Sequence, residues 1–197
     1  DRHRLTPACR AGSAVEATRS VVVLHSTDAA TVFLSLHARS ELAQEDIERE
    51  LYEERSLVRM LGMRRTLFVA PRELVPVVEA AATRAIAARE RKRLEQMVAV
   101  SELSKQPAAW VRRAMATALR EVEARGEAFT SDLTKSVPVL AKRIRFGTAG
   151  TKWETTLSAG SRILPQLAME RKVVRGRPRT TWVNGQYRWV PTAAWLG

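Results

Sequence analysis

The sequence predicts an α+β fold that is mainly helical and carries short β-hairpins. Apolar residues recur at helical spacing in several segments, of which 107–125 is the longest clear case. Two stretches, 56–69 and 172–190, combine β-favouring residues with tight-turn residues. Both stretches are also basic, which indicates that the hairpins face an anionic partner.

The overall charge balance supports such a partner. The 197 residues include 33 Lys and Arg against 21 Asp and Glu, a net charge of +12 at pH 7. Nucleic acid is the first partner that this balance indicates, and an anionic membrane surface is the second. No apolar run approaches the length of a membrane span, and no secretory signal is visible. We therefore expect a cytoplasmic, nucleoid-associated protein without a membrane partner.

Metal and cofactor chemistry has no clear signal in the sequence. Cys9 is the only cysteine of the chain, so no intrachain disulfide can form. Cys9, His3, His25 and His37 do not have the spacing of a zinc site. The segment 147–152 resembles a phosphate loop but lacks the spacing of a Walker A motif. We predict no metal and no cofactor.

The first 55 residues predict three helices. Ser13 can cap a helix over 13–24, because a glutamate follows three residues later, the spacing of a capping box. The cap-forming residues at 25–28, His-Ser-Thr-Asp, predict a second helix from Ala29. In the third helix, over 40–55, acidic side chains share a face that we expect to be exposed.

A helix–helix–hairpin arrangement is predicted to occur twice. In the first unit, 1–71, a hairpin over 56–69 carries Arg64 and Arg65 beside its turn. Alanine-rich connecting helices are predicted over 72–104. The second unit, 105–197, is predicted to contain a helix at 107–125, a flexible turn at 147–152 and a helix at 155–170 that precedes a second basic hairpin.

This second hairpin lies within 172–190. The runs 173–174, 180–183 and 186–190 predict three short strands. Asn184-Gly185 favours a two-residue type I′ turn between the last two, with Trp182 facing Tyr187 and Val183 facing Gln186. The basic connection 176–179, Gly-Arg-Pro-Arg, is not expected to be a strand.

The basic residues of this region predict a surface for phosphate groups. No Asp or Glu lies between 171 and 190, and an unopposed cluster of like charges costs self-repulsion unless an anion uses it. A basic ribbon directly after a helix is typical of a winged helix, so the chain predicts tandem winged-helix units that bind double-stranded DNA. The alternative is a solubilising surface hairpin. The predicted DNA-binding residues are Arg64, Arg65, Arg171, Lys172, Arg175, Arg177, Arg179 and Arg188.

The segment His25-Ser26-Thr27-Asp28 supports two interpretations. Asp28 or Thr27 can cap the following helix while His25 is structural. Alternatively, the segment is a catalytic or base-contacting loop in which a His and an Asp orient a water molecule or contact a sugar.

Several strings resemble one bacterial family of winged-helix DNA-binding-domain proteins, abundant in actinobacteria. This family includes DNA glycosylases that excise bulky alkylated bases and unhook interstrand crosslinks. The strings are RHRL at 2–5, LHSTDAATV at 24–32, RSLVRM at 55–60, MRRTLFV at 63–69 and YRW at 187–189, with Trp195.

The resemblance implies tandem winged-helix units and a further C-terminal portion beyond Gly197 that closes the DNA cleft. Its glycosylases carry Gln-x-Gln, Gln-x-Asp or His-x-Gln at the place of 25–27. His25 matches the last pattern at its first position, whereas Thr27 departs from all three, and Asp28 lies one residue out of register. The resemblance thus implies that His25 orients the water, assisted by Thr27 or Asp28.

Three functions follow as hypotheses. The first is a DNA-binding protein that contacts duplex DNA through its basic wings. The second is a monofunctional DNA glycosylase, with His25, Thr27 and Asp28 as candidate catalytic residues. The third is a protein-interaction module that docks a basic partner through the acidic helix around 45–54.

Overall fold

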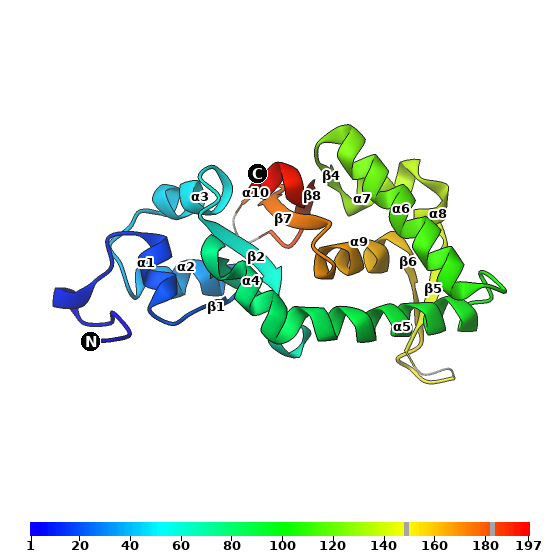
Figure 1. Cartoon of the computed structure of the whole chain (residues 1–197), viewed down its shortest axis with the longest axis horizontal. Helices are drawn as coiled ribbons and strands as arrows, with labels where there is room; N and C mark the ends of the chain where they lie inside the picture. Colours follow the sequence, from blue (N-terminus) through cyan, green and yellow to red (C-terminus); the bar gives the residue numbers. More distant parts are fainter. Residues whose placement is uncertain (148–149, 182–183) are drawn as a thin grey trace. The chain divides into compact units, whose positions relative to one another are not determined.

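The computed structural model describes residues 1–147, 150–181 and 184–197 (Figure 1). Its residues form two compact units. The first contains Asp1–Thr83, Val174–Tyr187 and Leu196, and the second contains Arg84–Val173, Arg188–Trp195 and Gly197. The α+β prediction is confirmed, since helices dominate and the strands form small antiparallel sheets. The winged-helix organisation, with boundaries after 71 and 104, stays a prediction.

The first unit combines short helices with a three-stranded sheet of order β1-β3-β2. Apolar residues from its helices and the sheet fill its core, including Phe33, Leu36, Ile47 and Leu57. The elements are α1 (Ala14–Arg19), β1 (Leu24–His25), α2 (Ala29–His37), α3 (Gln44–Tyr52), β2 (Leu57–Leu61), β3 (Leu67–Pro71) and α4 (Val75–Val78), a π-helix (Glu79–Thr83), and 3-10 turns at Pro7–Cys9, Met63–Arg65 and Arg72–Leu74.

The second unit is mainly helical. Its elements are α5 (Arg84–Val100), α6 (Pro107–Arg125), β4 (Ala128–Phe129), α7 (Thr130–Ser136), α8 (Pro138–Ala141), β5 (Arg143–Phe146), β6 (Thr155–Ser158), α9 (Gly160–Met169) and α10 (Thr192–Leu196). Strands β7 (Val173–Pro178) and β8 (Tyr187–Pro191) each contribute residues to both units, and β4-β8-β7 is the order of their sheet.

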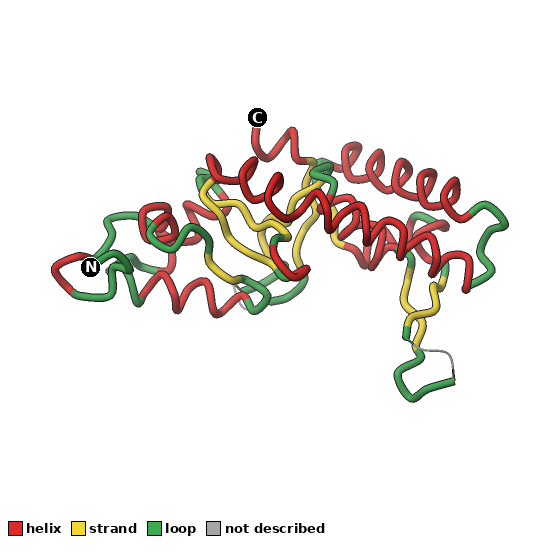
Figure 2. Tube along the Cα trace, turned by 60° about the horizontal axis from the view of Figure 1, so that its bottom comes forward, coloured by secondary structure: helices red, strands yellow, loops and turns green. Residues whose placement is uncertain are grey.

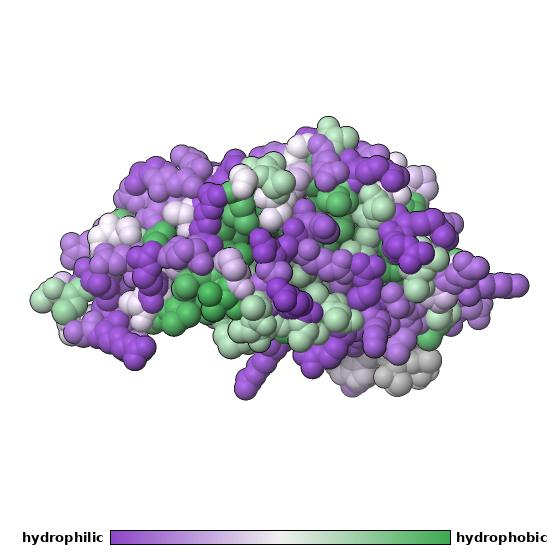
Figure 3. All heavy atoms as spheres, viewed as in Figure 1, coloured by the Kyte–Doolittle hydropathy of each residue, from purple (hydrophilic) through white to green (hydrophobic). Residues whose placement is uncertain are grey.

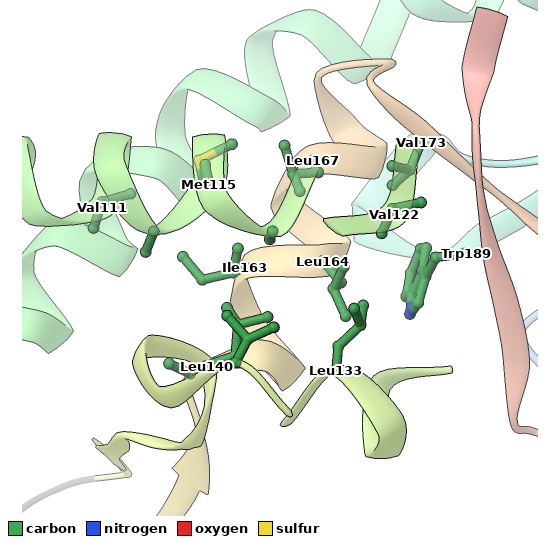
Figure 4. Packing of buried hydrophobic residues seen from close by; sticks show 14 of the residues in the cluster. Val111, Met115, Val122, Leu133, Leu140, Ile163, Leu164, Leu167, Val173 and Trp189 are labelled. Carbon is green, nitrogen blue, oxygen red and sulfur yellow. The ribbon is translucent and has the colours of Figure 1, made fainter. Parts of the chain in front are cut away.

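Helices α6 and α9 face each other across the core of the second unit, and residues from α7 and α8 complete it (Figure 4). The indole N–H of Trp189 donates to Oγ1 of Thr130 at 2.8 Å, so its polar group is satisfied at the edge of this core. The labelled core residues are Val111, Met115, Val122, Leu133, Leu140, Ile163, Leu164, Leu167, Val173 and Trp189.

Two predicted helices are shorter than the sequence suggested. The helix predicted over 13–24 ends at Arg19, because Leu24 and His25 instead pair with β3. The helix predicted over 155–170 begins at Gly160, because 155–158 pairs with 143–146 as a hairpin. The hairpin leaves the flexible turn predicted over 147–152 untested, because residues 148 and 149 lie outside the described part. Figure 2 shows it projecting from the helices of its unit.

Two predictions for the C-terminal hairpin were wrong. Strand β7 runs through Gly176 and Arg177 to Pro178, so most of the 176–179 connection is strand. Strand β7 lies at the edge of its sheet, where a proline is tolerated because its missing N–H need not pair with a neighbouring strand. Thr180 and Thr181 are bends rather than the start of a strand. The predicted pairs Trp182–Tyr187 and Val183–Gln186 involve residues outside the described part.

The acidic face of α3 also differs from its prediction. Glu50, expected to be exposed with Asp46 and Glu54, is buried. Its carboxylate accepts the backbone N–H groups of Ala14 at 2.7 Å and Val15 at 2.8 Å. These groups lie in the first turn of α1, where a helix has free donors and favours negative charge. Glu50 therefore fastens α1 to α3.

Candidate functional site

The predicted catalytic residues lie where β1 passes into α2. His25 is the last residue of β1, and Thr27 and Asp28 lie in the three-residue connection to α2. Asp28 is the N-cap of α2, and its Oδ1 accepts the backbone N–H of Ala30 at 3.1 Å. This confirms the predicted cap and gives Asp28 a structural task.

Hydrogen bonds hold this connection against β3. The backbone N–H of Ser26 donates to the carbonyl of Leu67 at 2.7 Å, and the N–H of Leu67 donates to Oγ1 of Thr27 at 3.3 Å. One residue earlier, His25 pairs with Phe68, with ring centroids 5.5 Å apart and an edge-on angle of 82°. The register of β1 on β3 thus fixes where His25 and Thr27 lie.

His25 and Thr27 contact each other directly. Nε2 of His25 lies 3.1 Å from Oγ1 of Thr27, and both residues are exposed. If the hydroxyl donates to Nε2, the imidazole carries its proton on Nδ1. If Nε2 donates, Nδ1 can accept a proton from water. In either tautomer the hydroxyl orients the ring, which is the task that a catalytic histidine requires of its neighbour.

The basic turn of the β2–β3 hairpin lies at the same end of the sheet. Leu67, which contacts Thr27, follows Arg64 and Arg65 after a single residue. Both arginines are exposed and have positive φ, 54° and 61°. The structure thereby brings together two candidate groups that stand about forty residues apart in sequence.

Gly62 makes this turn possible. A Cβ at this position would lie 2.8 Å from Cδ2 of Phe68, closer than side chains approach one another. The turn is closed by the N–H of Gly62, which donates to the carbonyl of Thr66 at 2.9 Å. Consecutive left-handed non-glycine residues are costly and persist only where the surroundings hold them. The turn is therefore a fixed platform for its two arginines.

The cations of the C-terminal hairpin have partners that the sequence did not reveal. Arg177 forms ion pairs with Glu48 at 2.7 Å and Glu53 at 3.1 Å. Arg188 pairs with Glu127 at 2.8 Å. The premise that no acidic residue opposes this cluster was wrong, because its partners come from elsewhere in the chain.

The remaining predicted cations differ in exposure. Arg171, Lys172 and Arg179 are exposed. Burial, and secondarily the charge of Arg59, lowers the pKa of Arg175 to about 10. Within the C-terminal hairpin, Arg171, Lys172 and Arg179 are therefore more accessible to a partner than Arg175, so the predicted set does not act as one uniform patch.

Sequence analysis missed the β5–β6 hairpin as a candidate surface. Trp153, in its connecting segment, has 71% of its surface exposed, and Nζ of Lys152 lies 5.1 Å from the centroid of its ring. Arg143 and Arg145 on β5 are exposed as well. The alternation Arg-Ile-Arg-Phe at 143–146 is a strand signal that could have revealed it.

Within the described part of the chain, no group of three or more His, Cys, Asp or Glu side chains could hold a metal ion. No helix there has the length and apolar character needed to cross a membrane. Hydrophilic residues cover most of the face shown in Figure 3.

A comparison with protein families identifies the relatives of this chain. The model described as DNA glycosylase AlkZ-like matches residues 18–197. The chain belongs to the AlkZ-like DNA glycosylase family. No curated protein and no solved structure matches it.

Membership in the AlkZ-like family changes the order of the three hypotheses. A glycosylase family implies DNA as the substrate, and it supports base excision better than DNA binding alone. The matched residues include both the 25–27 segment and the basic turn at 62–66. The acidic docking face finds less support, because Glu50 is buried and Glu48 and Glu53 pair with Arg177.

Proposed function

We propose that this protein is a monofunctional DNA glycosylase that removes alkylated purines from double-stranded DNA. The observation that carries the proposal is the contact between Nε2 of His25 and Oγ1 of Thr27 at 3.1 Å, beside a basic turn. The AlkZ-like family supplies the reaction class, and this contact supplies a pair of polar groups that can position a water molecule.

The reaction is hydrolysis of the N-glycosidic bond. The bond between C1′ and N9 breaks, and its electron pair leaves with the base, while the oxygen of water adds to C1′. An N7-alkylated purine carries a positive charge, so it departs as a neutral base and needs little help from an acid. The enzyme must therefore mainly position and activate the water. The proton of this water passes to His25 or to solvent as the new bond forms.

Thr27 supports His25 in this scheme. A threonine hydroxyl cannot supply the negative charge of a carboxylate to a developing oxocarbenium ion. It can orient the imidazole or hold the water through a hydrogen bond. We therefore propose that His25 positions the water and that Thr27 orients the ring of His25. Asp28 caps α2.

Arg64 and Arg65 are proposed to contact the DNA backbone beside this site. Phosphate contacts fix the register of a protein on its duplex, and a rigid turn suits that purpose. Arg171, Lys172 and Arg179, with Trp153 and its neighbouring cations, are proposed as further contacts. Crosslink unhooking breaks the same type of bond and belongs to the same proposal.

The test is a single-turnover assay on duplex DNA that contains one N7-alkylguanine. The expected result is release of free base from an otherwise intact strand, leaving an abasic site that alkali cleaves. A gel shift on the same duplex measures binding separately. A shifted duplex without released base would contradict the glycosylase proposal for this lesion and favour a protein that binds DNA without excision.

A further inference from the structure

A buried arginine in the first unit lacks a hydrogen-bond partner. Arg59, on β2, is only 6% exposed, and none of its three guanidinium nitrogens has a hydrogen-bond partner among the described residues. Its guanidinium carbon lies 4.6 Å from the centroid of the Tyr187 ring. Ring contact alone compensates poorly for removing a full charge from water, because such a charge needs ion pairs or hydrogen bonds.

A second cation shares the same ring. The guanidinium carbon of Arg175 lies 5.6 Å from the centroid of Tyr187. Burial and the charge of Arg59 lower the pKa of Arg175 to about 10, so Arg175 still carries its proton at neutral pH. The positive charges of Arg59 and Arg175 therefore lie near the same ring in a partly buried environment, where their repulsion is screened less than in water.

The nearby carboxylates of Glu48 and Glu53 pair with a different arginine. Glu48 and Glu53 form ion pairs with Arg177, whose guanidinium lies over the ring of Tyr52 at 4.9 Å. The hydroxyl of Tyr52 is buried and has no hydrogen-bond partner among the described residues. Burial raises the pKa of Tyr52, an effect that the positive charge of Arg59 opposes, so the hydroxyl remains a donor at neutral pH.

We propose that Arg59 and Arg175, with the hydroxyl of Tyr52, form a binding site for a phosphate group. All of these residues belong to the first unit. An oxyanion would neutralise the two cations and accept hydrogen bonds from the guanidinium of Arg59 and the hydroxyl of Tyr52, which have no partner among the described residues. Phosphate suits two guanidinium groups better than a halide does, since several oxygens can accept their fixed donor pairs. The group comes either from a phosphodiester of DNA or from free phosphate, and the site does not depend on the excision chemistry of His25.

The first experiment compares thermal unfolding and isothermal titration in inorganic phosphate with the same measurements in chloride at equal ionic strength. The parent protein is expected to bind phosphate and to unfold at a higher temperature in its presence. Arg59→Met is expected to raise the unfolding temperature without phosphate, because it removes an unpaired buried charge. The same variant should bind phosphate about tenfold more weakly or worse.

Arg49→Met is the matched control. Arg49 lies on the neighbouring α3 but is exposed and paired with Asp46 and Glu54, so its loss should leave the phosphate response unchanged. If Arg59→Met does not fold, Arg175→Met and Tyr52→Phe test the same site, and each should weaken phosphate binding. A parent protein without a phosphate response, or equal responses in the parent and the site variants, would overturn the proposal.

Addition of duplex DNA distinguishes the two sources of the phosphate group. Displacement of bound phosphate by the duplex would identify a backbone phosphodiester as the ligand. Simultaneous binding of both would identify free phosphate. Neither measurement depends on base release. A negative result for the phosphate site would therefore leave the glycosylase proposal unaffected.

Discussion

Nε2 of His25 lies 3.1 Å from Oγ1 of Thr27, and the same oxygen accepts the backbone N–H of Leu67 at 3.3 Å. The hydroxyl has one proton, which it can give only to the imidazole or to a water molecule. Because Leu67 begins the strand after the basic turn, this oxygen links the candidate catalytic histidine to the segment that carries Arg64 and Arg65.

Removing either member of this pair should slow base release more than it weakens DNA binding. We expect His25→Ala to lower the single-turnover rate about a hundredfold, within the range of general acid–base contributions. Thr27→Val should lower the rate about tenfold, since it keeps the shape but removes the hydroxyl that orients the ring, while Thr27→Ser should retain most of the rate. Chromatography of the released base measures each rate.

His37→Ala is the control for His25. His37 is exposed at the last residue of α2 and takes no part in the contacts of the 25–27 segment. Its replacement should leave base release at the rate of the parent. Release by His25→Ala as fast as by the parent would show that His25 is not catalytic.

Replacing Arg64 and Arg65 together by alanine should weaken binding of all duplex sequences. Each lost phosphate contact reduces the slope of log affinity against log salt by about one, so the double variant should show a slope lower by about two. Fluorescence anisotropy at several salt concentrations measures it. Arg49→Ala combined with Arg125→Ala is the control, because it removes two exposed cations that pair with carboxylates.

The sequence predicted correctly those elements that are determined by residues close together in the chain. The helix predicted over 107–125 coincides with α6, because Pro107 begins it and Gly126, with φ of 74°, ends it. The basic hairpin at 56–69 and the Asp28 cap were also predicted correctly. These features depend on residues within a few positions of one another.

The elements that were predicted wrongly depend on contacts between residues far apart in the sequence. Leu24 leaves the predicted helix and, together with His25, pairs with β3, which lies more than forty residues later. Glu50 is buried because its hydrogen-bond donors, Ala14 and Val15, lie about 35 residues earlier. The contact of Thr27 with Leu67 likewise joins residues far apart in the sequence. Periodicity could identify the candidate site residues one by one but could not show that they meet.

Arg177 and Arg179 should behave differently, although the sequence places them together in the proposed DNA contact. Arg177 is held by Glu48 and Glu53, whereas Arg179 is exposed. We expect Arg179→Ala to reduce the salt slope by about one, and Arg177→Ala to change it little. Arg177→Ala should instead lower the midpoint of thermal unfolding slightly, since it removes partly exposed ion pairs.

The double variant provides a further check on this assignment. Its salt slope should equal that of Arg179→Ala alone. An unchanged slope in the double variant would remove this hairpin from the DNA contact surface.

Glu50→Ala should destabilise the first unit by roughly 2–4 kcal/mol. The change leaves two N–H groups of α1 without their charged acceptor, and hydrogen bonds to charged groups contribute about 1.5–3 kcal/mol each. Denaturant unfolding measures the loss. Glu45→Ala on the exposed side of the same helix should change stability by less than about 0.5 kcal/mol, and an equal loss in both variants would contradict the role of Glu50.

Trp153 should report DNA binding by its fluorescence. The residue is 71% exposed beside Lys152, and a base that has left the duplex stack can stack on an exposed aromatic ring next to a cation. Duplex DNA is expected to quench the emission of the parent, and Trp153→Phe should lose that part of the quenching while keeping most of the affinity. Trp153→Ala should weaken binding by about 1–3 kcal/mol.

The chain has five tryptophans, so the contribution of Trp153 must be isolated by comparison with a second variant. Trp110→Phe on α6 serves this purpose, because Trp110 is half-buried against the core of the second unit. It should leave the DNA-dependent quenching intact. Equal quenching in the parent and Trp153→Phe would place the β5–β6 hairpin outside the DNA contact, since a base cannot cover this ring without changing its emission.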